Sequence, residues 1–157
     1  MRAAIFGLLL LAGGLSGIVV LDADAATSQD VNTHGATCVN FNAAEARDID
    51  FLSSGVRNIN AAARPVICAV KRHPVTGPGQ AFFIDGSNAA GASTSCTASS
   101  FSFTGVFRTS ESFTESTATY DRSLILETVS FFDYVSLLCT LPPSGRGVLF
   151  GVTAVDN

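Results

Sequence analysis

Short apolar segments separated by turn residues recur along most of this chain, and their spacing restricts the fold more than any other feature. From residue 36 onward they follow one another every eight to fifteen positions. Within them apolar and polar residues alternate, so that Val66, Cys68 and Val70 share one face of an extended segment. Strands spaced in this way are typical of a sandwich or barrel. We therefore predict an all-β, two-sheet, mainly antiparallel β-sandwich of about seven to nine strands.

Turn residues set the limits of the expected strands. A capping box at Asn42-Ala43-Ala44-Glu45 predicts one helical turn, and Asp85-Gly86-Ser87-Asn88 predicts a turn. Residues 109–119 are expected to form a hairpin or a loop, and a hairpin is predicted about Asp133. The strands are expected at residues 36–42, 48–52, 56–60, 66–72, 80–85, 94–107 (one strand, or a bent pair with a bulge at Gly105), 123–132, 134–141 and 147–155.

The beginning of the chain has the composition of an export signal. Arg2 supplies a positive charge, residues 3–21 carry no charge, and Ala23-Asp24-Ala25 fits the cleavage pattern of small residues. A retained membrane anchor is the alternative, because nineteen uncharged residues could just span a bilayer. We expect residues 1–25 to be a signal peptide, residues 26–35 to be a flexible lead-in, and residues 36–157 to form a single domain with no membrane span.

Charge and compartment narrow the choice of partners. Beyond residue 25 the chain has eleven acidic and eight basic residues, a net charge of −3. This mild acidity gives no electrostatic reason to expect nucleic acid or an anionic membrane as a partner. The export signal predicts a secreted or periplasmic protein, and in that compartment an even number of cysteines predicts disulfides.

Four cysteines, Cys38, Cys68, Cys96 and Cys139, allow three pairings, and their spacing does not choose between them. A structural zinc site needs closer pairs, because Cys68 and Cys96, the nearest two, are 28 positions apart. One pairing would join Cys68 to Cys139 across two sheets, as in immunoglobulin domains. That domain type also has a core tryptophan, and this chain has none.

The order of the cysteines and the segments around two of them resembles a group of small exported bacterial proteins of unknown function. The residues that carry the resemblance are Cys38, Val66-Ile67-Cys68-Ala69-Val70-Lys71-Arg72, Cys96 and Tyr134-Val135-Ser136-Leu137-Leu138-Cys139-Thr140-Leu141-Pro142-Pro143. Where that group often has Cys-Pro-Val, this chain has Cys68-Ala69-Val70. The resemblance implies one disulfide-bonded β-sandwich with Cys38 joined to Cys68 and Cys96 joined to Cys139. It implies no activity.

No set of side chains marks an active site, and we predict no catalytic residue, no cofactor and no metal. His34 and His73 are the only histidines, and no G-x-S-x-G motif is present. Asp48 and Asp50 would share one face of a strand, from which paired carboxylates could catalyse proton transfer or bind calcium. Exposed positions of a half-buried strand give the same pattern.

Two adjacent phenylalanine pairs, Phe82-Phe83 and Phe131-Phe132, indicate an interaction surface. Neighbouring strand residues face opposite ways, so each pair turns one ring outward, where it could contact a protein partner or a second copy. Most of the other phenylalanines are expected in the core, among them Phe101, Phe103 and Phe107.

The sequence thus favours a non-enzymatic exported protein of structural or binding type. One alternative is a small hydrolase or metal-dependent enzyme that uses Asp48, Asp50 or His73. The other is a glycan-binding module, which would present Tyr120 or Tyr134 beside a shallow groove.

Overall fold

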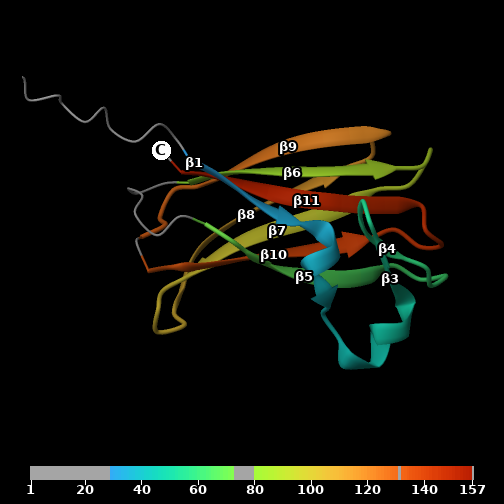
Figure 1. Ribbon diagram of the computed structural model, residues 1–157, viewed down its shortest axis with the longest axis horizontal. Coiled ribbons are helices and arrows are strands. Elements are labelled where there is room, and N and C mark those ends of the chain that lie inside the picture. The colour runs from blue at the N-terminus through green and yellow to red at the C-terminus, as the bar shows by residue number, and fades with distance from the viewer. Residues whose placement is uncertain (1–28, 73–79, 131, 157) are drawn as a thin grey trace, which may run out of the picture.

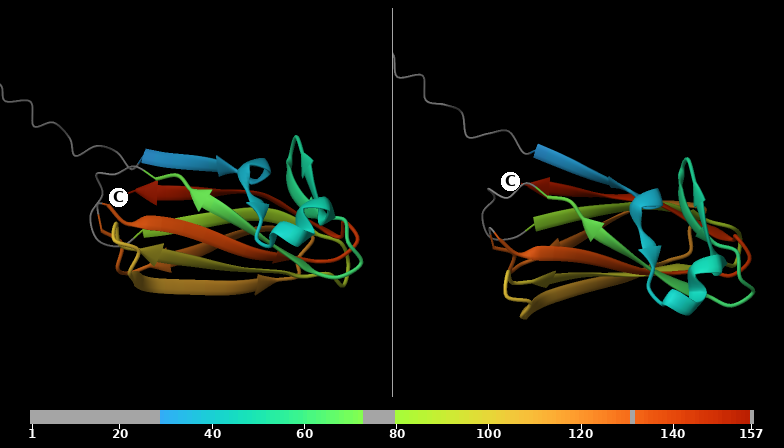
Figure 2. Two further views of the ribbon diagram at one scale, coloured as in Figure 1. Left: turned by 90° about the horizontal axis from the view of Figure 1, so that it is seen from below. Right: turned by 60° about the horizontal axis from the view of Figure 1, so that its bottom comes forward.

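Two β-sheets packed face to face form the structure, a computed structural model that describes residues 29–72, 80–130 and 132–156 (Figures 1 and 2). The larger sheet has the strand order β3-β4-β11-β6-β9, and β1 also pairs with β11. The smaller sheet has the order β2-β5-β10-β7-β8. Every strand pair is antiparallel. The predicted two-sheet antiparallel sandwich is confirmed, with eleven strands in the described part of the chain where seven to nine were expected.

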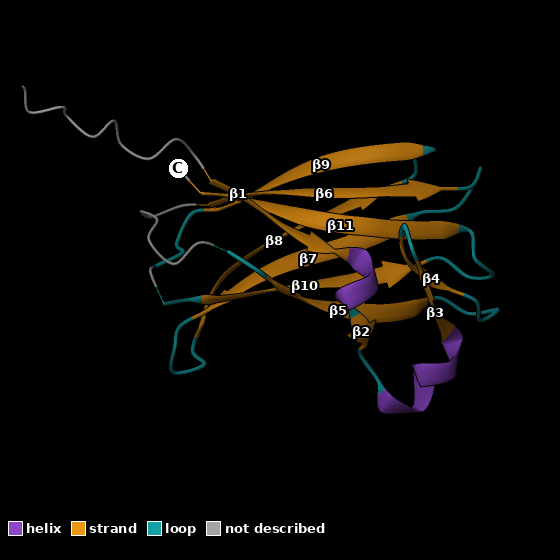
Figure 3. Cartoon of the chain, viewed as in Figure 1, coloured by secondary structure: helices purple, strands orange, loops and turns teal. Residues whose placement is uncertain are grey.

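The six strands of the larger sheet are β1 (Gln29–His34), β3 (Ile49–Leu52), β4 (Gly55–Asn58), β6 (Gln80–Asn88), β9 (Thr119–Leu126) and β11 (Gly147–Asp156). The five strands of the smaller sheet are β2 (Val39–Asn40), β5 (Arg64–Val70), β7 (Thr94–Phe101), β8 (Phe107–Glu115) and β10 (Tyr134–Leu141). Two short 3₁₀ helices, η1 (Gly35–Thr37) and η2 (Ala43–Asp48), lie beside β2, β3 and β4 (Figure 3). No helix in these described segments is long and apolar enough to cross a membrane.

The core lies between the sheets and is filled by alternate residues of each strand. On β5 the side chains of Val66, Cys68 and Val70 are buried, as their alternation predicts. On β6 the buried residues include Phe82 and Ile84, which face the smaller sheet. Burial of these side chains supplies most of the free energy that holds two amphipathic sheets together.

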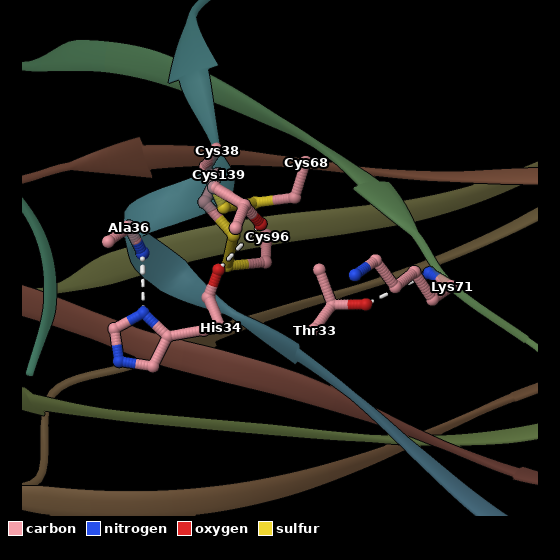
Figure 4. The surroundings of a disulfide bond; sticks show 9 residues. Thr33, His34, Ala36, Cys38, Cys68, Lys71, Cys96 and Cys139 are labelled. Atoms are coloured by element: carbon pink, nitrogen blue, oxygen red, sulfur yellow. Dashed lines mark hydrogen bonds between the residues drawn. A yellow bond between two sulfur atoms is a disulfide. The ribbon is translucent and has the colours of Figure 1, made fainter.

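Both disulfides lie on the inner face of the smaller sheet (Figure 4). Cys38 is bonded to Cys68, and Cys96 is bonded to Cys139, each with 4.1 Å between the Cα atoms. This is the pairing by chain order that the resemblance implies. Cys96 and Cys139 are direct register partners on β7 and β10. The immunoglobulin-like pairing of Cys68 with Cys139 across two sheets is wrong, because each of these cysteines is bonded to another one and their strands lie in the same sheet.

The N-terminal segment differs from the expected flexible lead-in. Gln29–His34 forms β1, which pairs along its whole length with β11. Backbone hydrogen bonds to an available strand edge suffice for this, so the polar segment needs no apolar alternation of its own. Thr33 is buried, and its hydroxyl accepts a hydrogen bond of 2.9 Å from the backbone of Lys71 (Figure 4). The expected signal peptide, residues 1–25, lies outside the described residues.

Three local expectations are corrected by the strand pairing. Residues 94–107 form β7, a turn and the start of β8, so that Gly105, at φ 81°, lies in the turn and not in a bulge. The segment Asp85-Gly86-Ser87-Asn88 is not a turn but the end of β6. The hairpin about Asp133 does not form, because β9 pairs with β6 in the larger sheet whereas β10 pairs with β5 and β7.

The expected helical turn at residues 42–45 is present as the start of η2. The capping box itself is incomplete. The Asn42 side chain makes no capping hydrogen bond to the backbone and instead donates to the Glu45 carboxylate at 3.1 Å.

Tyr120 explains how Gly86 is accommodated inside a strand. The two residues are register partners on β9 and β6, and a Cβ atom at Gly86 would overlap the Tyr120 hydroxyl. The phenol thus fills the space that the glycine leaves, and its ring also meets Phe113 edge-on at 6.1 Å. Burial raises the pKa of Tyr120 to about 12, and the carboxylates of Asp85 and Glu115 act in the same direction.

Tyr120→Phe is expected to reduce the loss of stability at high pH. Unfolded tyrosine ionises near pH 10, whereas folded Tyr120 holds its proton until about pH 12. The unfolded state of the natural protein is therefore favoured progressively as pH rises from 10 to 12, by on the order of 2 kcal/mol. Urea unfolding at pH 8, 10 and 11.5 measures this effect. The same pH dependence in both proteins would contradict the assignment.

Candidate functional site

An aromatic row crosses the outer face of the smaller sheet at one end. Side chains alternate along β10 and β7, so Tyr134 and Phe101 point away from the core. On β8 a shift of register beside Phe101 pairs that residue with the exposed Phe107. Tyr134 is the register partner of Phe101, which is in turn the partner of Phe107. The two phenylalanine rings meet edge-on with 5.9 Å between their centroids. Three rings from three adjacent strands therefore form one continuous apolar band.

Apart from Leu138, the rest of the outer face formed by β10, β7 and β8 is covered by serine and threonine side chains. The row next to the rings consists of Ser136, Ser99 and Ser110. The following rows consist of Leu138, Thr97 and Ser112, and of Thr140, Ser95 and Thr114. The aromatic row and these three rows contain no charged residue. The face thus offers rings and neutral hydroxyl groups, which suits an uncharged ligand that has both apolar and hydroxyl surfaces.

A cavity of about 760 Å³ lies at the aromatic end of this face. Three of its wall residues are strongly exposed: Phe103 at 68%, Phe132 at 73% and Tyr134 at 66%. The other residues around it are Ala69, Val70, Arg72, Asp133 and Val135. Its size falls within the range of sites that hold small organic ligands.

A second cavity, of about 370 Å³, lies on the other side of Tyr134. It shares Ala69, Tyr134 and Val135 with the first cavity. Its remaining residues come from η1, β2, β5, β7 and β10 and are Thr37, Val39, Ile67, Cys68, Phe101 and Ser136. Of these three shared residues, Tyr134 is the one with an exposed aromatic ring.

The backbone before Tyr134 is held by polar contacts of Arg72 and Asp133. Arg72 Nη1 donates to the backbone oxygens of Ser130 and Asp133, at 2.9 and 3.0 Å. The Asp133 carboxylate accepts a hydrogen bond of 2.8 Å from the Ser130 backbone and lies 3.9 Å from Arg108 Nε. Its side chain is almost fully buried. These contacts fix the turn from which Tyr134 projects, as an aromatic platform requires.

The carboxylates considered for catalysis are not paired with each other. Asp48 lies in η2 rather than on a strand, and it accepts a hydrogen bond of 2.6 Å from Arg64 Nε. That bond holds the pKa of Asp48 below its usual range. Asp50, on β3, binds its register partner Arg57 at 2.8 Å. Each carboxylate is thus paired with a different arginine. Because Asp48 lies in η2 and Asp50 on β3, the two side chains do not share the strand face that the sequence predicts.

Of the two histidines, the structure describes His34. His34 Nδ1 accepts a hydrogen bond of 3.1 Å from the backbone of Ala36 and so caps η1 (Figure 4). His73 lies outside the described residues. Within the described parts of the chain, no group of three histidine, cysteine or acidic side chains is placed to hold a metal ion.

Three of the four phenylalanines of the proposed interaction surface lie among the described residues. Phe82 is fully buried and Phe83 is half-buried on the outer face of the larger sheet. Phe132 is exposed beside the first cavity, and Phe131 lies outside the described residues. Of the two tyrosines, Tyr120 is in the core and only Tyr134 is exposed beside a cavity.

The assignment of Phe101, Phe103 and Phe107 to the core is wrong. Phe103 and Phe107 are exposed, and Phe101 is half-buried on the outer face. The disulfide explains the direction: Cys96 must face inward to reach Cys139, and Phe101 is five residues further along the strand, so it faces outward. The parity of a bonded cysteine is therefore the sequence feature that could have found the direction of Phe101.

No family model and no curated protein sequence matches this chain. Among solved structures, it is similar to the native family 35 carbohydrate-binding module from Clostridium thermocellum, with a TM-score of 0.54 and 13% identity over 82% of this chain and 99% of that one. Weaker similarities are to BiXyn10A CBM1 in its apo form (TM-score 0.46, 12% identity, 84% and 92% of the two chains) and to TmCBM61 in complex with beta-1,4-galactotriose (0.45, 7%, 84% and 90%). At 13% identity, the first similarity shows a shared fold.

Proposed function

We propose that this protein binds carbohydrate without chemical turnover, at the outer face of the smaller sheet around Tyr134. The observation that carries the proposal is the exposed Tyr134 ring, which stands between two cavities and beside a field of neutral hydroxyl groups. Sugars present apolar C–H faces that pack on aromatic rings, and hydroxyl groups that exchange hydrogen bonds with serine and threonine. The fold shared with a carbohydrate-binding module supports the same assignment.

This proposal selects the glycan-binding alternative over a purely structural role. It also disfavours the hydrolase alternative, because Asp48 and Asp50 are each engaged by an arginine. Two buried disulfides fit a secreted or periplasmic protein, since thiols are kept reduced in the cytosol. We propose that residues 1–25 act as the export signal for such a protein.

Tyr134→Ala is expected to weaken glycan binding at least thirtyfold. Removing a central aromatic contact typically costs 2 kcal/mol or more of binding free energy, which corresponds to about that factor. Isothermal titration calorimetry with β-1,4-linked oligosaccharides of xylose, glucose, mannose and galactose measures the affinity. Phe51→Ala is the matched control, because Phe51 is a half-exposed ring on β3 of the other sheet. The control is expected to bind as the natural protein does.

Two outcomes would overturn the proposal. One is that none of these sugars binds the natural protein. The other is that Tyr134→Ala retains full affinity while it separates a dimer on size-exclusion chromatography. That result would assign the aromatic band to contact between two copies, as the first hypothesis from the sequence holds.

A further inference from the structure

We infer, on the basis of the proposed carbohydrate function, that the ligand is an internal stretch of a neutral, linear glycan that lies across both cavities at once. The end lobe is the larger cavity, walled by Phe103, Phe132 and Tyr134. The sheet lobe is the smaller one, walled by Val39, Ile67 and Phe101 as well as Tyr134. Because both lobes include Tyr134, a ligand that stacks on this ring has room to extend from it in two directions.

The sheet lobe has the extent that a chain of several sugars requires. Apart from Thr37 of η1, its residues come from β2, β5, β10 and β7, which are consecutive neighbours in the smaller sheet. Neighbouring strands lie about 4.8 Å apart, so four strands span roughly 14 Å. This is longer than one pyranose ring. Ser136 belongs to the same lobe and gives it a hydroxyl group beside the apolar contacts.

Charge argues for a neutral glycan rather than an acidic one. The outer rows of β10, β7 and β8 carry no charged residue, and Val39, Ile67 and Ala69 continue this pattern on β2 and β5. The two charged residues in the wall of the end lobe are engaged within the protein: Arg72 donates to two backbone oxygens, and the Asp133 carboxylate accepts from the Ser130 backbone. A uronic acid would therefore meet no cation placed to bind its carboxylate in the sheet lobe.

A variant that obstructs only the sheet lobe tests the inference. Val39 is 54% exposed and lines that lobe alone, so Val39→Arg places a long side chain in it without touching the end lobe. Ile59→Arg is the matched control, because Ile59 is 51% exposed and lines neither lobe. Circular dichroism of both variants verifies that they are folded.

Calorimetry with one to six sugar units of the best neutral ligand gives the decisive result. The affinity of the natural protein is expected to rise more than tenfold from the monosaccharide to the tetrasaccharide. Val39→Arg is expected to remove this increase, whereas Ile59→Arg is expected to leave it unchanged. A uronic acid tetrasaccharide is expected to bind more weakly than the neutral one.

The failures of the two proposals are distinguishable. Equal affinity for one and four units, or equal behaviour of Val39→Arg and Ile59→Arg, would overturn the two-lobed site and leave carbohydrate binding at Tyr134 intact. Tighter binding of the uronic acid chain would overturn the preference for a neutral ligand. Absence of binding to every sugar would overturn the proposed function itself.

Discussion

Phe82→Ala is expected to lower the free energy of unfolding by about 3–5 kcal/mol, the usual cost of truncating a core phenylalanine. Phe82 is fully buried on β6, the strand that lies between β11 and β9 in the larger sheet. Its neighbours on the same face are Ala154 and Leu124, which are also buried. Neither can fill the volume of a lost ring, so a cavity would remain. Urea unfolding followed by circular dichroism measures the change.

Phe83→Ala is the matched control for this prediction. Phe83 is the next residue on β6, but it faces outward between Thr153 and Ser123. Its truncation is expected to cost about 1 kcal/mol or less. Equal costs for the two variants would mean that the register of β6 differs by one residue, because such a shift exchanges the inner and outer faces of a strand.

Removal of either disulfide is expected to lower the free energy of unfolding by about 3–4 kcal/mol in the chain-entropy model. The bonds close loops with sequence separations of 30 residues (Cys38–Cys68) and 43 residues (Cys96–Cys139). Without these bonds the unfolded chain gains conformational entropy, whereas the folded protein does not, so the unfolded state is favoured. The double variants Cys38→Ala/Cys68→Ala and Cys96→Ala/Cys139→Ala, unfolded in urea under oxidising conditions, measure the two costs.

The single variants and a reductant complete this experiment. Cys38→Ala is expected to leave one free thiol at Cys68 and an intact bond between Cys96 and Cys139, which peptide mapping detects. Dithiothreitol is expected to lower the stability of the natural protein below that of either double variant, because it removes both bonds once the chain unfolds. A double variant as stable as the natural protein, or a mapped bond between Cys68 and Cys139, would contradict the structure.

Alternation along the chain was sufficient to predict the fold class and much of the core. Val66, Cys68 and Val70 of β5 face inward, as do Val135, Leu137, Cys139 and Leu141 of β10. These segments are central strands with one buried face, where an apolar residue at every second position reflects burial directly. The two-sheet sandwich follows from several such segments separated by turns.

The alternation of apolar and polar residues did not predict which distant segments pair with each other. The segments of β9 and β10 are close in the sequence and both contain apolar residues, which favours a hairpin, yet they belong to different sheets. The polar β1 has no alternation to reveal it and is defined by its pairing with β11. In both cases the pairing partner of the strand depends on which other strand edges are available in the folded protein. The local composition of a segment does not reveal which partner it will pair with.

One part of the candidate site could be predicted from the sequence, and another part depends on strand pairing. That Tyr134 faces away from Val135, Leu137 and Cys139 follows from the sequence alone, because side chains alternate along a strand. That its ring stands in a row with Phe101 and Phe107, between two cavities, was decided by the order β5-β10-β7-β8 and its register. The physical reason is that alternation is a property of one strand, whereas a binding face is assembled from several strands by long-range pairing.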